Sequence, residues 1–122
     1  MAANRVFLRD DGIVEIHVVG VQNAASVELM GREVSTLLSY LRAKKKPCLV
    51  LDDLLDIGPV DQGGRNKVVE LGKRLDFDKA AMVGKGALLR MGANLMLHAT
   101  GRADKMKFFE NRDDALSWLT EV

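Results

Sequence analysis

The residues best suited to bind a ligand or to take part in a reaction follow an apolar run that begins at Cys48. Four carboxylates follow that run: Asp52, Asp53, Asp56 and Asp61. A glycine-rich segment, Gly58–Arg65, overlaps with them and leads into a predicted helix. Carboxylates at the end of a parallel strand can hold Mg²⁺, whereas free backbone N–H groups at the start of a helix can bind an anion. This segment is therefore the first place to look for a ligand site.

The carboxylates do not fit the Mg²⁺ site of a phosphoacceptor receiver domain. The first acidic pair of a receiver precedes a helix, whereas Asp10 and Asp11 fall in a predicted hairpin turn. The hydroxyl expected after the strand that ends at Val83 is missing, because Gly84 follows it. We therefore interpret the four carboxylates as solvated side chains that cap turns, and we predict no metal site.

The sequence also lacks the usual catalytic and cofactor patterns. Its two histidines, His17 and His98, stand in no H-x-x-x-H or H-E-x-x-H spacing. No serine lies in a G-x-S-x-G elbow. Gly84-x-Gly86 opens a predicted helix, but Leu89 occupies the place of the third glycine of a dinucleotide fingerprint. We predict no catalytic residue and no cofactor, and hence that the chain is not an enzyme.

Composition indicates one ordinary globular domain over residues 1–122. The chain has 122 residues, of which 48% are hydrophobic and 29% charged. A net charge of +1 argues against a dedicated nucleic-acid binder. The single cysteine, Cys48, excludes an intrachain disulfide and reads as a small buried apolar residue. No apolar stretch is long enough to span a membrane, so we expect a cytoplasmic protein.

The apolar patterns predict alternating strands and helices. Two short strands flank the turn Asp10–Gly12, and a long helix ends before Pro47. Three strand–helix units follow, with strands at Cys48–Leu51, Lys79–Val83 and Met106–Phe109, and with Asn111 as the cap of the last helix. This order requires parallel pairing with right-handed crossovers. We predict an α/β fold, in which a mixed sheet of about five strands starts with an antiparallel hairpin and carries about four helices.

Two segments carry a resemblance to a known family. Asp53–Gly64 resembles the phosphorylation loop of the STAS domains, in which an aspartate-leucine pair ends a strand and Asp-Ser-Ser/Thr-Gly opens the next helix. The C-terminal segment Lys107–Leu119 resembles the ending of the SpoIIAA-like branch of that superfamily, an aromatic strand before an Ala-x-x-Trp-Leu helix. The resemblance covers the whole chain in element order and implies a SpoIIAA-like fold. The branch is similar in fold to the lipid-binding CRAL-TRIO (SEC14) domains.

The chain departs from the STAS pattern at its functional residue. Gln62 stands where the family has its phosphorylated serine, and no Ser or Thr occurs between Ser39 and Thr100. A switch that works by phosphate charge therefore cannot operate in this loop. What remains is either a ligand or anion site or simply a well-capped helix start. The residues of this predicted loop site are Asp53, Asp61, Gln62, Gly63 and Gly64.

The third predicted helix, Ala87–Thr100, is apolar over most of its circumference. A surface helix needs a narrower apolar stripe, so the surplus must face a partner, a ligand pocket or the interior of the monomer. Leu97 lies seven residues, about two turns, after Arg90, which places it on the polar side of the helix. We predict a homodimer or partner surface there, made by Arg90, Asn94, Leu97 and His98.

These observations lead to two hypotheses of function. The first is a non-enzymatic STAS-like regulatory or protein-interaction module without a serine phosphoswitch. The alternative is a carrier or sensor of a lipid or another small hydrophobic ligand, which rests on the likeness to CRAL-TRIO domains and on the apolar third helix.

Overall fold

The computed structural model of the chain describes residues 3–121 and contains one five-stranded sheet. The strands are β1 (Arg5–Leu8), β2 (Val14–Gln22), β3 (Leu49–Val60), β4 (Lys79–Val83) and β5 (Met106–Phe109). The helices are α1 (Ala24–Ala43), α2 (Gln62–Arg74), α3 (Ala87–Thr100) and α4 (Arg112–Leu119), with a short 3-10 turn at Ala103–Lys105. The strands lie in sequence order, β1 antiparallel to β2 and all others parallel. The predicted fold class is thus confirmed.

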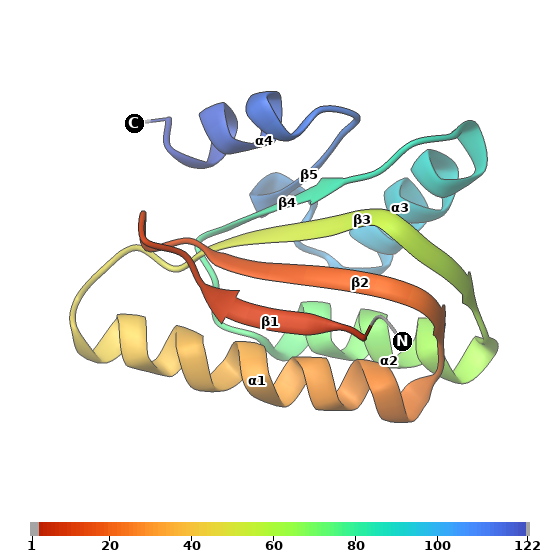
Figure 1. Ribbon diagram of the computed structural model, residues 1–122, viewed down its shortest axis with the longest axis horizontal. Coiled ribbons are helices and arrows are strands. Elements are labelled where there is room, and N and C mark those ends of the chain that lie inside the picture. The colour runs from red at the N-terminus through yellow and green to blue at the C-terminus, as the bar shows by residue number, and fades with distance from the viewer. Residues whose placement is uncertain (1–2, 122) are drawn as a thin grey trace.

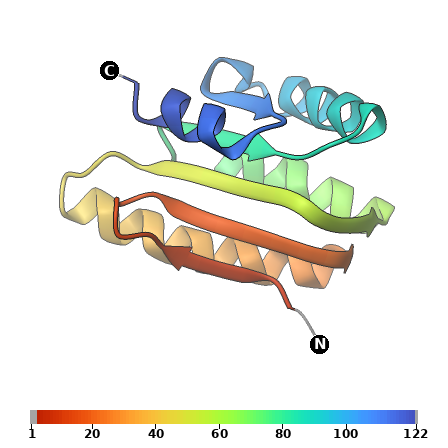
Figure 2. The same ribbon diagram turned by 45° about the horizontal axis from the view of Figure 1, so that its top comes forward.

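The sheet separates two layers of unequal size. Helices α1, α2 and α3 cover one face, and the short α4 lies on the other, at the top of Figure 1. Successive side chains of a strand point to opposite faces of the sheet. Val14 and Val50 therefore face the layer of three helices, whereas Ile13 and Leu51 face α4. Helix α4 covers β3, β4 and β5 and leaves β1 and β2 open on its side (Figure 2). The described residues include no helix that is long and apolar enough to cross a membrane.

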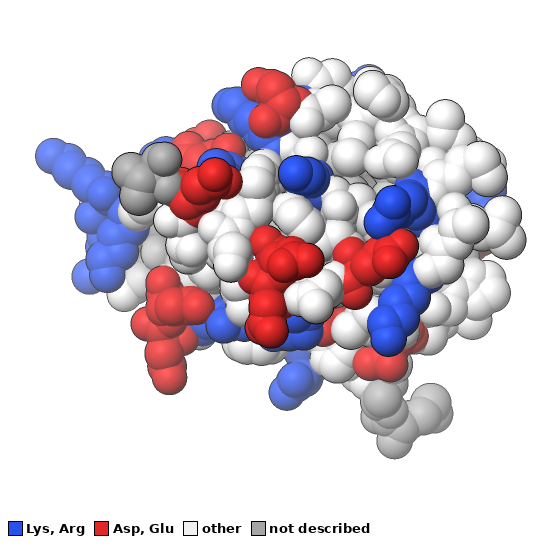
Figure 3. Space-filling model, turned by 90° about the horizontal axis from the view of Figure 1, so that it is seen from above, with Lys and Arg blue, Asp and Glu red and all other residues white. Residues whose placement is uncertain are grey.

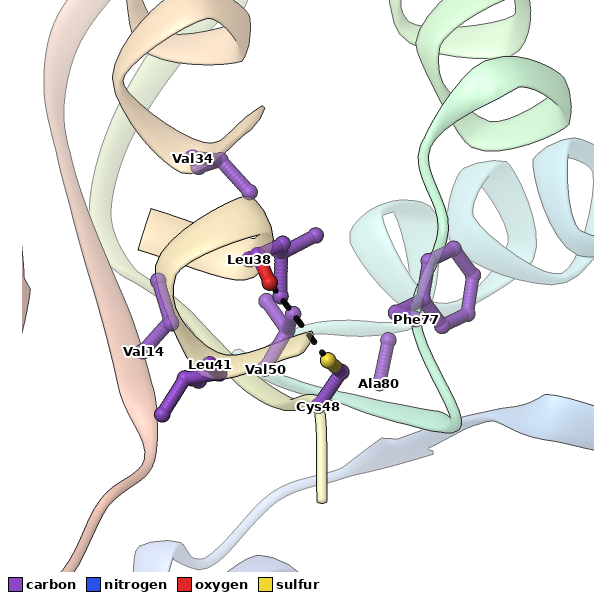
Figure 4. Packing of buried hydrophobic residues seen from close by; sticks show 8 residues of the cluster. All are labelled: Val14, Val34, Leu38, Leu41, Cys48, Val50, Phe77 and Ala80. Carbon is purple, nitrogen blue, oxygen red and sulfur yellow. Dashed lines mark hydrogen bonds between the residues drawn. The ribbon is translucent and has the colours of Figure 1, made fainter. Parts of the chain in front are cut away.

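Local signals account for the element ends. Gly12 takes a φ of +84° in the hairpin turn, a conformation that glycine adopts without strain. The Asn111 side chain accepts hydrogen bonds from the N–H groups of Asp113 and Asp114, as predicted for a cap of the last helix. Cys48 is fully buried under α1, with its Sγ 3.7 Å from the carbonyl oxygen of Leu38 (Figure 4). Burial raises the pKa of this thiol, which is an inert core residue as expected.

Strand β3 is much longer than the predicted Cys48–Leu51. It continues to Val60, because the second half of β2 also pairs with it. The pairing changes register twice along the way, and Val60 then lies opposite Gln22. Strand β4 ends at Val83, opposite Asp53, so the far part of β3 has a strand on one side only. A free edge tolerates Pro59. The glycine-rich segment is therefore strand up to Val60 and helix from Gln62 onward, and Asp52 and Asp53 lie inside β3 rather than at its end.

Two close contacts fix the rotation of α3 about its own axis. A Cβ built on Gly72 of α2 would lie 2.5 Å from Thr100 Cγ2, so the two helices touch where glycine leaves room. At the other end of α3, the Leu89 side chain lies against Gly84. With Leu89 and Thr100 turned inward, Leu97 also faces the core and is 7% exposed. The predicted placement of Leu97 on an open surface was wrong.

We expect Gly72→Ala to lower the free energy of unfolding by about 1–3 kcal/mol, the usual cost of overpacking. The new methyl group would collide with Thr100, whose hydroxyl is held by the Leu97 carbonyl oxygen at 2.8 Å. Gly92→Ala in α3 is the matched control, since its Cβ would meet nothing within 4 Å. That variant should be as stable as the wild type, or more stable by up to about 1 kcal/mol. Equal urea midpoints for the two variants would contradict the close approach of α2 and α3.

Candidate functional site

The predicted anion loop at the start of α2 is a self-capped helix terminus. Asp61 is the N-cap, and its Oδ1 accepts a hydrogen bond of 2.7 Å from the Gly64 N–H. A carboxylate thus occupies the position that an anion would take, and the Gly64 N–H is already engaged. The side-chain amide of Gln62 donates a hydrogen bond of 2.9 Å to the Asn66 side chain. The expectation of free N–H donors at this point was wrong for Gly64.

Asp53 does not belong to the same place as the helix start. It lies in β3 seven residues before Val60, roughly 20 Å away along an extended strand. Its side chain faces α4, where its Oδ2 accepts a hydrogen bond of 2.8 Å from Arg112. The structure therefore divides the predicted loop site into two unrelated parts.

Around Asp53 the structure assembles an ionic cluster that bridges α4, β2 and β3. Arg112, the first residue of α4, donates to Glu15 at 3.0 Å and to Asp53 at 2.8 Å. Arg9, in the hairpin, donates to Glu15 at 2.9 Å. Glu15 and Asp53 are each 6% exposed. Burial alone would raise the pKa of Glu15, but hydrogen bonds from Arg112 and Arg9 outweigh it and hold that pKa below its usual value.

Sequence reasoning missed Glu15, Arg9 and Arg112. Glu15 did carry a signal, because it interrupts a run of β-branched residues at an inward-facing position of a strand. Nothing in the sequence links it to Arg112, which lies 97 residues later. Arg9 also pairs with the more exposed Asp11 at 3.1 Å, so two guanidinium groups serve three carboxylates. Each of the two buried carboxylates has a guanidinium partner, and Arg112 ties α4 to β2 and β3.

On the same side of the sheet, His17 faces Asp56, with 2.9 Å between Nε2 and Oδ2. Asp56 is exposed, so the pair sits at the open part of the sheet. Within residues 3–121 no three His, Cys, Asp or Glu side chains are grouped so that they could hold a metal ion. Figure 3, which looks onto this face, shows charges of both signs there and a largely white area over α3 at its upper right.

Asp52 carries a partly buried carboxyl group that has no cationic partner among the described residues. It lies on the opposite face of β3, between Ile16 and Met82 of the neighbouring strands, under the three helices. Its Oδ1 is buried without a hydrogen-bond partner among the described residues. Burial raises the pKa of Asp52 to about 7, with a further contribution from the Asp53 carboxylate. The sequence-based view of this residue as a solvated turn cap was wrong.

The outer side of α3 is the apolar feature of the surface. Three side chains at helical spacing, which we call the α3 stripe, are 80%, 55% and 68% exposed: Leu88, Met91 and Leu95. Arg90, Asn94 and His98 are exposed, but Arg90 turns toward Glu110, at 3.0 Å, and the Phe108 ring. The apolar centre of this surface is thus the α3 stripe and not Leu97.

Two hollows of the surface are open to solvent and partly polar. One groove of about 480 Å³ lies between α1 and the end of α2, lined by Leu38, Arg42, Arg74 and Asp76 among others. Another, of about 460 Å³, lies beside the hairpin turn and is lined by Phe7, Arg9, Asp11 and Glu15 among others. Neither resembles the enclosed apolar cavity that a carrier of a hydrophobic molecule requires.

We expect Arg112→Met to lower the free energy of unfolding by about 2–3 kcal/mol, because it leaves Glu15 and Asp53 buried with less positive charge. The loss should fall below that of a fully buried pair, since the Arg112 side chain is 34% exposed. Arg74→Met is the matched control. Its ion pair with Glu70 is exposed on both sides and should contribute about 0.5 kcal/mol. If urea denaturation gave similar losses for both variants, the ionic cluster would have no special role.

Asp52 should make the protein less stable as the pH rises from about 4 to 7. In this range the unfolded chain releases the proton at the ordinary pKa of 3.8, whereas the folded chain keeps it up to about 7. The folded state therefore binds more protons, and the loss reaches at most about 4 kcal/mol. The lowered pKa values of Asp11, Glu15, Glu28 and Asp78 act in the opposite direction, at lower pH.

The measurement is the free energy of unfolding of Asp52→Asn and of wild type between pH 4.5 and 8. The stability of the variant relative to wild type should increase with pH. The exposed Asp104→Asn serves as a control that removes one carboxylate elsewhere. Parallel curves for wild type and Asp52→Asn would show that Asp52 ionises normally in the folded protein.

Comparisons with known proteins agree with this architecture. No curated protein matches the sequence. A solved structure from Shewanella loihica PV-4, described as an uncharacterized protein of the DUF3478 family with a SpoIIAA-like fold, is 24% identical to this chain. The match has a TM-score of 0.64 and covers 96% of this chain and 92% of the other. The model of the SpoIIAA-like family matches residues 13–120, and the chain therefore belongs to the SpoIIAA-like family.

Proposed function

We propose that this chain is a non-enzymatic, STAS-like protein-interaction module that binds its partner through the outer side of α3. The observation that carries the proposal is the α3 stripe, in which Leu88, Met91 and Leu95 stay exposed although the opposite side of the helix packs into the core. Contiguous exposed apolar side chains on a surface helix are typical of binding sites.

The fold keeps the α3 stripe exposed, and this leaves apolar surface in contact with water, which is unfavourable in free energy. The inward side of α3 is already filled by Leu89, Ala93 and Leu97. The outward residues cannot turn in without breaking the contacts at Gly72 and Gly84. Burial of each large apolar side chain of the stripe would contribute about 1–2 kcal/mol, because this surface leaves water. A partner that covers the stripe would gain that free energy.

The charged groups favour binding over catalysis. The carboxylates of the ionic cluster are neutralised by Arg9 and Arg112, and the Oδ1 of Asp52 is buried under the three helices. Membership in the SpoIIAA-like family supports the same proposal. Gln62 has no hydroxyl, so control by phosphorylation at that position is not part of it. The alternative of a lipid carrier finds no support in the shallow hollows.

The proposal predicts that the wild-type chain migrates as part of a larger complex in a concentrated lysate of its own cells. Leu88→Ser/Met91→Ser/Leu95→Ser should shift it to the 13.4 kDa position of the free chain. Val21→Ser/Leu29→Ser, at exposed apolar positions outside α3, is the control and should migrate like wild type. Circular dichroism would verify that all three are folded.

The readout is gel filtration with detection of a tagged chain. The proposal fails if wild type and both variants all migrate at the mass of the free chain. It also fails if native mass spectrometry of the purified chain finds a stoichiometric lipid instead of a protein, because that result identifies a carrier.

A further inference from the structure

We propose that the segment docked on the α3 stripe is an amphipathic helix of another protein with acidic residues beside its apolar side. This inference rests on the proposed function and specifies the chemistry of the partner. It follows from the charges around the stripe and from a notch within it.

Three basic side chains belong to the parts of the chain next to α3, two on α2 and one in the turn before α3. Arg65 lies seven residues, about two turns, before Gly72, so both are on the side of α2 that faces α3. Lys73 follows Gly72, and Lys85 stands in the turn that opens α3. Each of the three is exposed and makes no salt bridge with any described residue. We call Arg65, Lys73 and Lys85 the basic rim.

Acidic residues are absent from this part of the sequence. No Asp or Glu occurs from Lys79 to Ala103, a range that includes all of α3. Glu70 is the only acidic residue of α2, and it is held by Lys67 at 3.1 Å and Arg74 at 3.4 Å. Lys67 also pairs with Glu28 of α1, so these charges lie on the α1 side of α2. On the β5 side of α3, Glu110 is paired with Arg90 at 3.0 Å. The charges toward α2 that have no partner among the described residues are therefore all basic, which favours an acidic partner.

The shape of the stripe favours a protein helix over a lipid surface. Leu88 and Leu95 are seven residues apart, so the stripe is a narrow line about 10 Å long. Gly92 interrupts it, and a Cβ at that position would meet nothing within 4 Å. A notch between two leucines can receive a protruding side chain of a second helix, as ridges pack into grooves. A membrane surface has no such side chain to insert.

The same charges disfavour a second copy of this chain. In a two-fold dimer, each surface meets its own copy across the axis. Docking of two α3 stripes would bring the basic rim of one copy near that of the other, with no acidic residue of α3 to compensate. The expected homodimer is thus less favourable at this surface than a complex with an acidic helix.

The test replaces the exposed Ala99, three turns after Leu88 on the outer side of α3, by photoreactive benzoylphenylalanine in the full chain. Irradiation in cells links the partner, and mass spectrometry then identifies the linked segment. Arg65→Glu/Lys73→Glu/Lys85→Glu should reduce the yield of this product about tenfold, because attraction turns into repulsion. Lys44→Glu/Lys45→Glu/Lys46→Glu changes the net charge equally at the far end of α1 and should leave the yield unchanged. The linked segment should be helical and should carry Asp or Glu beside apolar residues at spacings of three and four.

Each other outcome overturns the inference. A product of two copies of this chain identifies a homodimer, and a linked segment without acidic residues excludes the proposed chemistry. Sedimentation of the purified chain with phosphatidylserine vesicles, lost on Leu88→Ser/Met91→Ser/Leu95→Ser, identifies an anionic membrane. If the serine variant loses the product but reversal of the basic rim does not, the partner chemistry fails while the proposed function stands. If wild type gives no product, the proposed function itself fails.

Discussion

The structure depends on how the central strand β3 accommodates two adjacent carboxyl groups in a buried position. Neighbouring side chains of a strand point to opposite faces, so Asp53 faces α4 and Asp52 faces the three-helix layer. Asp53 meets Arg112, which ties α4 to the sheet. Asp52 meets no cation, and its pKa rises to about 7 because the neutral acid is the form that burial tolerates. The face under α4 thus combines apolar packing with an ionic cluster, whereas the face under the three helices is packed with apolar side chains around a carboxyl group without a cation.

The apolar layer determines which surface remains for binding. Helix α3 is apolar nearly all round, so either of its sides could have formed the core. Two glycines determine which side of α3 is buried, because Thr100 packs against Gly72 and Leu89 packs against Gly84. The α3 stripe is the consequence, since Leu88, Met91 and Leu95 are left outside. A packing constraint between helices thus produces the surface on which the proposed function rests.

The chain combines a SpoIIAA-like architecture with a helix start that carries no hydroxyl group. Helix α2 begins with Asp61 as its cap and Gln62 as its first residue. Basic side chains without a salt bridge to a described residue lie on the α3 side of α2 and in the turn before α3. A module built in this way would recognise a partner by a fixed combination of apolar and basic contacts instead of a switchable phosphate.

The sequence by itself determined the type and order of the elements, because these depend on local signals such as apolar period, the Asp10–Gly12 turn and the Asn111 cap. It did not determine the length of β3, since Asp53 to Val60 became strand by pairing with β2. Nor did it reveal the contact between Glu15 and Arg112, whose attraction exists only after the fold brings them together. The inward turn of Leu97 was likewise decided by tertiary structure. On a helix that is apolar over most of its circumference, periodicity does not select the buried side, and steric fit against α2 and the sheet does.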